Sequence, residues 1–288
     1  MSTVNSKAGA TGSIKADVKR TAQKAEFSPL MEAVTRLGYG VRGLIYIIMG
    51  LLAVQVALGR GGALASPLGA IAKIGKQPAG MVLLWIVLLG LVSYALWGVV
   101  RAVMDPLHKG RDMKGLLARF GFLVSAFGYA ILILPTYGYI SGTSQASKGS
   151  QTEKFFTSIM AMPWGRWAIG ILGLAVLAGG LYQIYLAFKA GFDRQFQIYA
   201  LTPKEVKLAT NVGRFGTAAR GVVLAIVGGL ISLSAYQSNP GQPVGMDAAL
   251  ATLLHQPYGI WLLGIVAVGL IAFGIYSLLS AAWFRLKR

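Results

Sequence analysis

Six stretches of mostly apolar residues constrain what this chain can fold into. A helix that crosses a bilayer needs about 20 consecutive apolar residues. Six segments approach or reach that length: Leu37–Leu58, Met81–Val100, Phe120–Ile140, Trp167–Phe188, Arg220–Tyr236 and Ile260–Phe284. Only 12% of the residues are charged, against about 25% in soluble domains. The sequence therefore predicts an all-α membrane protein with six transmembrane helices.

The distribution of basic residues predicts the orientation of these helices. The net charge is +18. With a cytoplasmic N-terminus, most of the 27 lysines and arginines fall on the inner side, including Arg101 in the loop after the second span. The opposite side holds Arg60, Lys73, Lys76, Lys148, Lys154 and Arg166. Cytoplasmic loops are rich in Lys and Arg, so we expect a membrane protein with both termini cytoplasmic. The same rule explains the basic composition, so no nucleic-acid partner is expected.

The chain repeats one two-span unit three times. The first halves begin "RLGYGVRGLIYIIMG" (36–50), "RFGFLVSAFGYAILI" (119–133) and "RFGTAARGVVLAIVG" (214–228). The second halves begin with Pro-x-Gly at Pro78, Pro163 and Pro257. Between the halves, residues 66–76, 151–162 and 246–255 have helical patterns too short to span a bilayer.

Three such units imply a symmetric architecture. Each unit crosses the membrane twice, so all three share one orientation, which predicts a pseudo-threefold axis along the membrane normal. We expect three tandem helix–short outer helix–helix repeats at residues 31–112, 113–206 and 207–288. Residues 1–30 are polar and basic, and are interpreted as a disordered cytoplasmic tail.

The repeated patterns resemble those of a known family. The head "RxGYxxRGxxY" and the tail "QPxGxxLLGxxxxGLxxxGxY" are similar to those of a bacterial integral membrane family catalogued as domain of unknown function 1206. The resemblance covers about residues 31–288 and implies three two-span repeats in a bacterial plasma (inner) membrane, but no activity. The second head departs from the pattern, because Ser125 and Ala126 replace Arg-Gly.

No constellation of residues predicts catalysis, a cofactor or a metal site. The chain has no cysteine, which excludes thiolate chemistry. Its nine acidic residues lie outside the predicted span cores, and His108 and His255 fall on opposite sides of the membrane. No phosphate-binding or dinucleotide-binding motif is present. We therefore expect that the protein is not an enzyme.

Arg42 and Arg220 are the two charges that the pattern places inside spans. One interpretation is that both side chains extend back to the headgroups. The other is that they turn inward and form a site for an anion or a lipid phosphate, whose candidate residues are Arg42, Arg220, Tyr39, Tyr46, Ser125 and Tyr129. Gln55 and Gln183 are expected to form interhelical hydrogen bonds or to line a polar path.

Two functional hypotheses remain open at this point. The first is a structural or interaction protein that binds anionic membrane lipid or a partner on its basic cytoplasmic face, with homo-oligomer formation as a further option. The second is a channel or transporter for a small anionic or polar solute, with a central site lined by Arg42, Arg220 and tyrosines. The first needs fewer assumptions, whereas the second explains the repeat symmetry and the two arginines.

Overall fold

The computed structural model describes residues 29–105, 110, 112–143, 158–189, 203–239, 241 and 244–283. The helices of this part of the chain are α2 (Pro29–Ala57), α3 (Pro67–Gly75), α4 (Gly80–Val103), α5 (Met113–Ala130), α6 (Ile133–Ile140), α8 (Gly165–Phe188), α9 (Pro203–Gln237), α10 (Met246–Leu254) and α11 (Gly259–Trp283). These residues contain no strand. The predicted tail falls almost wholly outside them, as does most of the short helix predicted at 151–162.

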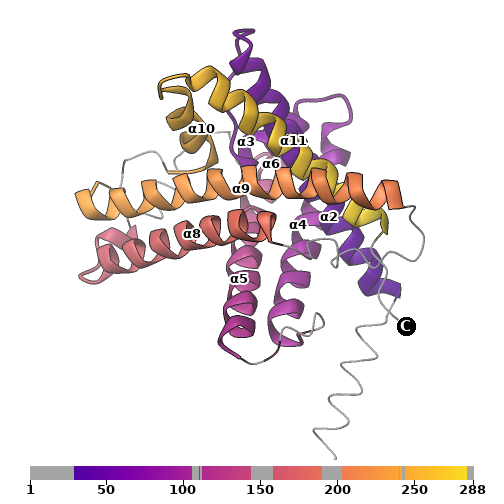
Figure 1. Ribbon diagram of the computed structural model, residues 1–288, viewed down its shortest axis with the longest axis horizontal. Coiled ribbons are helices and arrows are strands. Elements are labelled where there is room, and N and C mark those ends of the chain that lie inside the picture. The colour runs from indigo at the N-terminus through magenta and orange to yellow at the C-terminus, as the bar shows by residue number, and fades with distance from the viewer. Residues whose placement is uncertain are drawn as a thin grey trace, which may run out of the picture.

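Six stretches of helix are long and apolar enough to cross a membrane, which confirms the predicted fold class. They are Glu32–Ala57, Gly80–Val103, Ala118–Ile140, Gly165–Phe188, Val206–Gln237 and Gly259–Ala282. A helix bonds all its inner backbone groups internally, which is what a bilayer core requires. Figure 1 shows α9 running across the molecule with α8 beside it, while α2 lies against α11 and α4 against α5.

Two spans differ from the predicted outline. The fifth begins well before residue 220, because the helix extends through polar residues to Pro203, a residue type suited to the first helical position. The third is divided into α5 and α6, with a turn at residues 131–132. Pro135 lies in the first turn of α6 and has no N–H to donate to the preceding turn. The missing donor accounts for the interruption of this span.

The three Pro-x-Gly motifs make the same tight connection between a short helix and the following span. The second span of each unit begins at the glycine, at Gly80, Gly165 and Gly259. A Cβ atom at these positions would lie 2.2, 1.7 and 1.9 Å from the carbonyl oxygens of Gly75, Ile159 and Leu254, respectively. Only glycine allows so close an approach of two backbones. The repeated glycine is thus explained by packing.

Neighbouring repeats also meet through equivalent glycines. A Cβ at Gly43 on α2 would lie 2.8 Å from the carbonyl oxygen of Gly274 on α11. At the matching position of the third repeat, a Cβ at Gly221 on α9 would lie 2.8 Å from the carbonyl oxygen of Gly180 on α8. Small residues of this kind let transmembrane helices approach closely. The α2–α11 and α8–α9 interfaces are therefore two copies of one packing arrangement.

Within a repeat, the two spans pack through the glycine of the Arg-x-Gly motif in the first and third units. A Cβ at Gly38 would lie 2.9 Å from the Cα of Tyr94, and one at Gly216 would lie 2.5 Å from the Cα of Phe273. Tyr94 and Phe273 occupy equivalent positions in the repeat. In the second unit, Gly121 corresponds to Gly38 and Gly216, and Gly179 corresponds to Tyr94 and Phe273. A Cβ at either glycine would meet no atom within 4 Å. The second unit is therefore more open than the other two.

An arginine cluster as the candidate functional site

Arg42 lies in the interior of the bundle. It is carried on α2, and its side chain and backbone together are 7% exposed. Its Nε donates to the Oγ of Ser277 on α11 at 2.9 Å, and its Nη1 donates to the hydroxyl of Tyr94 on α4 at 2.5 Å. Its Cζ lies 4.6 Å from the centre of the Tyr39 ring. Arg42 therefore turns inward and does not extend along the surface of its helix to the headgroups.

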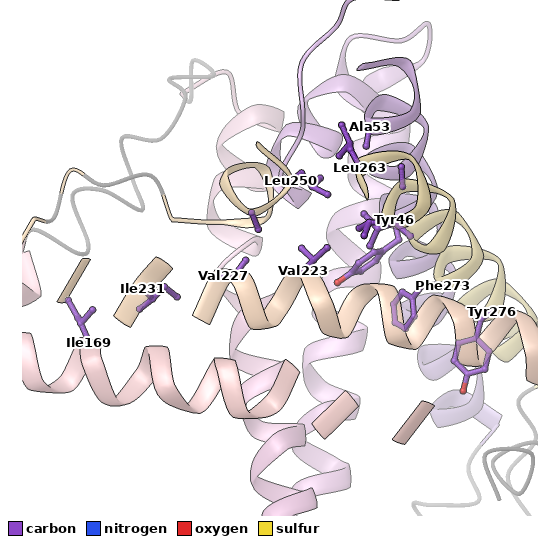
Figure 2. Close-up of a cluster of buried hydrophobic side chains, with 14 of the residues drawn as sticks. Tyr46, Ala53, Ile169, Val223, Val227, Ile231, Leu250, Leu263, Phe273 and Tyr276 are labelled. Carbon is purple, nitrogen blue, oxygen red and sulfur yellow. The ribbon is translucent and has the colours of Figure 1, made fainter. Parts of the chain in front are cut away.

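Arg220 is held in a corresponding way on α9. Its Nε donates to the hydroxyl of Tyr46 on α2 at 2.8 Å. Its Nη1 donates to the side-chain oxygen of Gln183 on α8. Figure 2 shows Tyr46 with its hydroxyl tip toward α9, close to Phe273. The interhelical hydrogen bond predicted for Gln183 is present, whereas the side chain of Gln55 is exposed.

The two arginine interactions are related by the repeat. Arg42 and Arg220 are equivalent in the first halves of their units, and Ser277 and Gln183 are equivalent in the second halves. Each arginine thus donates to the second span of the neighbouring unit, across the interfaces built on Gly43 and Gly221. One sequence pattern therefore produces the same polar contact twice.

A third arginine lies at the remaining interface, between α4 and α5. At this interface, Ser125 occupies the position equivalent to Arg42 and Arg220. Gly98 occupies the position equivalent to their acceptors, and a Cβ at Gly98 would lie 2.7 Å from the Cβ of Ala126. Arg101 follows Gly98 by one turn of α4 and is 7% exposed. Its Cζ lies 4.6 Å from the centre of the Phe122 ring on α5. Each inter-repeat interface therefore contributes one buried or partly buried arginine.

Two aromatic rings join the three guanidiniums into one group. The ring of Tyr94 has the Cζ of Arg42 at 5.0 Å and that of Arg101 at 5.6 Å. The ring of Phe273 has the Cζ of Arg42 at 4.9 Å and that of Arg220 at 5.1 Å. We call Arg42, Arg101 and Arg220, with Tyr94 and Phe273, the arginine cluster. Each of these contacts falls within the range of a cation–π interaction.

The electrostatics of the cluster are unbalanced. Arginine keeps its charge in proteins, and among the described residues the three guanidiniums contact hydroxyls, an amide and aromatic rings but no carboxylate. Removing a cation from water costs several kcal/mol even after relaxation. Neutral partners recover part of that cost. The arrangement is therefore suited to an anion, whose charge would offset the remainder.

The structure brings most of the candidate residues together. Tyr39 and Tyr46 contact Arg42 and Arg220, respectively, and the ring of Tyr129 lies 4.4 Å from that of Tyr94. Ser125 is half-buried, and its uncharged side chain adds no positive charge at the α4–α5 interface. The sequence pattern predicts Arg101 in the loop after the second span, and this is wrong: Arg101 belongs to the last turn of α4 and is buried.

Three cluster partners were missed for a common reason. Tyr94, Phe273 and Ser277 look like ordinary residues of apolar spans. The signal that could have found them is the repeat alignment, which pairs Ser277 with Gln183 and Tyr94 with Phe273. Reading partners off equivalent positions would have pointed to both arginine contacts.

The first arginine of each repeat lies outside the cluster and has a structural role. Arg119 donates from Nε to the carbonyl oxygen of Ala102 at 2.6 Å and from Nη2 to that of Val103 at 2.9 Å. Arg214 donates in the same way to the equivalent carbonyls of Ala187 and Phe188, at 2.9 and 3.3 Å. Both bind the open carbonyl end of the preceding repeat's last helix, where a cation is favoured.

Arg36 heads the first unit and has no preceding repeat. It forms an ion pair with Glu32, one turn earlier on α2, at 2.6 Å. The side chains of Arg36 and Glu32 are 41% and 30% exposed. Arg119 and Arg214 thus bind helix C-termini, Arg36 pairs within its own helix, and the arginine cluster is made by other residues.

Comparison with known proteins agrees with this threefold organisation. The model of a family described as Domain of Unknown Function (DUF1206) matches residues 37–105, 120–190 and 215–283. The chain belongs to this family. "Uncharacterized protein YxxB" of Bacillus subtilis (strain 168) is 30% identical over 260 residues, which cover 90% of this chain and 94% of that protein. No solved structure matches the chain at a significant level.

Proposed function

We propose that this integral membrane protein binds a small anion at the arginine cluster and acts as a channel or transporter for it. The observation that carries the proposal is the set of three guanidiniums whose contacts among the described residues are all neutral. A protein that used these arginines only as structural ties would be expected to pair them with carboxylates, because a buried cation without a counter-charge is costly.

The form of the contacts supports binding rather than simple packing. Arg42 and Arg220 are fixed by hydrogen bonds to Ser277, Tyr94, Tyr46 and Gln183. Each such bond orients a guanidinium without cancelling its charge. Fixed, preoriented donors bind an anion with little reorganisation. The cluster therefore has the properties of a preformed anion site inside a membrane bundle.

The symmetry of the fold supports a role in permeation. We propose that the three units share one orientation in the membrane, and each inter-repeat interface contributes one arginine to the cluster. Ionisable residues inside a membrane domain generally mark ion or substrate pathways. We further propose that the protein lies in the bacterial plasma membrane with both termini in the cytoplasm, as the distribution of Lys and Arg favours.

The alternative, binding of anionic lipid or a partner on a basic cytoplasmic face, stays a prediction. It depends mostly on residues outside the described part of the chain, such as Lys15, Lys19, Lys109 and Lys287. Homo-oligomer formation likewise stays a prediction.

The proposal is tested by binding and flux with one set of variants. Purified protein in neutral detergent is titrated with chloride, acetate and inorganic phosphate while its thermal unfolding is followed. A ligand at about 100 times its Kd stabilises the folded state by about 2.7 kcal/mol, which raises the unfolding midpoint by several degrees. The same protein in liposomes is assayed for flux of each anion.

The double variant Arg42→Gln with Arg220→Gln is expected to lose both the stabilisation and the flux. Arg166→Gln is the matched control, because Arg166 is exposed at the start of α8 and remote from the cluster in the repeat. The control should behave as the wild type does. The proposal fails if the wild type neither binds nor moves any of the three anions, or if the double variant retains both activities.

A further inference from the structure

The Nε–Nη2 edge of the Arg101 guanidinium has no hydrogen-bond partner among the described residues. Its Nε and Nη2 atoms are buried and make no hydrogen bond with any described residue. These two nitrogens lie on the same edge of the planar group, and their N–H bonds run parallel. Such an edge matches the two oxygens of a carboxylate or phosphate. A buried charged donor left unmatched is costly, so this edge is the part of the cluster with most to gain from a ligand.

A second donor without a hydrogen-bond partner among the described residues packs against Tyr94, the residue that Arg101 also contacts. The hydroxyl of Tyr129 is buried and makes no hydrogen bond with the described residues, and the residue is 8% exposed. Its ring lies 4.4 Å from the ring of Tyr94, and the Cζ of Arg101 lies 5.6 Å from the centre of that same ring. The guanidinium of Arg101 and the ring of Tyr129 thus pack on one aromatic side chain.

The other two arginines are bound differently. Arg42 uses Nε and Nη1 on Ser277 and Tyr94, and Arg220 uses Nε and Nη1 on Tyr46 and Gln183. Nε is one of the two donors of the bidentate edge, so neither Arg42 nor Arg220 has both donors of that edge available for a ligand. Arg101 is therefore the one member of the cluster whose bidentate edge remains free among the described residues.

We propose that Arg101 and Tyr129 form the subsite that recognises an oxoanion, a carboxylate or phosphate group, while Arg42 and Arg220 supply positive charge. The inference rests on the proposed anion binding and adds the chemical class of the ligand. A halide is a single acceptor atom, so it cannot offer a separate acceptor to each of the two parallel N–H bonds. The subsite therefore selects oxoanions over halides.

Two conservative variants test the subsite. Arg101→Lys keeps the charge but replaces the planar edge by a single ammonium group. Tyr129→Phe removes one hydroxyl. Tyr137→Phe is the matched control, because Tyr137 is exposed on α6. Affinities for inorganic phosphate, acetate and chloride are measured by titration calorimetry, and gel filtration reports folding.

The wild type is expected to bind acetate or phosphate at least ~10-fold more tightly than chloride, since a hydrogen bond to a charged group contributes that much or more. Arg101→Lys should reduce this preference about 10-fold while chloride affinity changes little. Tyr129→Phe should weaken oxoanion binding a few-fold, and Tyr137→Phe should change neither. If Arg101→Lys does not fold, Tyr129→Phe carries the test.

Two results would overturn the inference. One is a wild type that binds chloride as tightly as both oxoanions. The other is an equal loss of chloride and oxoanion binding in Arg101→Lys, which would mean that Arg101 supplies charge alone. Both results leave the proposed anion binding in place, whereas a wild type that binds no anion at all removes both proposals.

The same oxoanion chemistry can come from a solute or from a lipid headgroup. The calorimetric arm with inorganic phosphate in neutral detergent reports the solute. A second arm adds phosphatidylglycerol in mixed micelles and measures whether it displaces phosphate. Displacement that depends on Arg101 assigns the subsite to a headgroup, and binding of phosphate without displacement assigns it to a free solute. If phosphate, acetate and phosphatidylglycerol all fail to bind, the inference is wrong.

Discussion

The Nε of Arg42 donates a hydrogen bond to the Oγ of Ser277, 235 residues further along the chain, at 2.9 Å. This contact joins α2, the first span, to α11, the last. It lies beside the close backbone approach of Gly43 and Gly274. The first and third repeats are thereby joined at the arginine cluster, and the orientation of one charged group depends on a hydroxyl from the far end of the sequence.

Replacing Ser277 should therefore disturb the site more than the fold. Ser277→Ala removes the acceptor of Arg42 Nε, and an interhelical hydrogen bond in a membrane contributes about 0.6 kcal/mol on average. We expect a small loss of stability and a several-fold loss of anion affinity, because the guanidinium is less well positioned. Urea-dependent or thermal unfolding and anion titration measure the two effects.

Ser280→Ala is the control for this substitution. Ser280 lies one turn further along α11, and its hydroxyl donates within the helix to the carbonyl oxygen of Tyr276 at 2.8 Å. It should leave anion affinity unchanged. Equal losses of affinity in the two variants would show that the Arg42–Ser277 bond has no special part in positioning the cluster.

The glycines of the Arg-x-Gly motif should respond unequally to alanine. Gly216→Ala places a Cβ 2.3 Å from the backbone nitrogen of Phe273, and such overpacking costs about 1–3 kcal/mol. Gly121→Ala meets open space, so it should be neutral or stabilise by up to about 1 kcal/mol through helix propensity. Thermal unfolding of the two variants in detergent gives the comparison.

The same pair of variants tests the openness of the second repeat. If Gly121→Ala destabilises the protein as much as Gly216→Ala does, then α5 packs in the membrane as α2 and α9 do against their partners. Gly179→Ala provides a second test of this openness, because Gly179 on α8 occupies the position equivalent to Phe273. Its expected effect is likewise neutral or slightly stabilising.

Much of the fold followed from the sequence because the bilayer imposes simple rules. Span length and backbone satisfaction produce long apolar runs, and the repeated Pro-x-Gly motifs mark a backbone contact that no other residue permits. The openness of the second unit did not follow. It depends on which of several glycine pairs come together, and a small side chain looks the same in sequence whether it is packed or open.

The site was predicted only in part, for two physical reasons. Arg42 and Arg220 were found because a charge in an apolar run is conspicuous. Arg101 was missed because it lies at the end of a span, where a buried arginine and a loop arginine have the same sequence context. Ser125 occupies the position equivalent to Arg42 and Arg220, yet at that interface the cation comes from α4 instead of α5.

The helix-end arginines should contribute to stability. Arg214→Ala removes hydrogen bonds to the last carbonyls of α8, and we expect a loss of about 1 kcal/mol, within the range for a cation at a helix C-terminus. Arg214→Lys should recover part of it, because lysine keeps the charge without the fork of donors. Chemical denaturation of the purified variants measures these differences.

Arg166→Ala is the counterpart at the other end of α8. A cation near a helix N-terminus is unfavourable, so this variant should be neutral or slightly stabilising. The interpretation of Arg214 would be wrong if both alanine variants lost the same stability, since a general effect of charge removal would then explain the result.

The orientation can be tested with single cysteines, because the wild-type chain has none. Arg60 follows α2 and Lys189 follows α8, and both side chains are exposed. A chain with its N-terminus in the cytoplasm places the end of the first span outside and the end of the fourth span inside. Arg60→Cys should therefore react with a membrane-impermeant maleimide in intact cells, and Lys189→Cys should react only after permeabilisation. The cysteine-free parent gives the background, and the reverse labelling pattern would contradict the predicted topology.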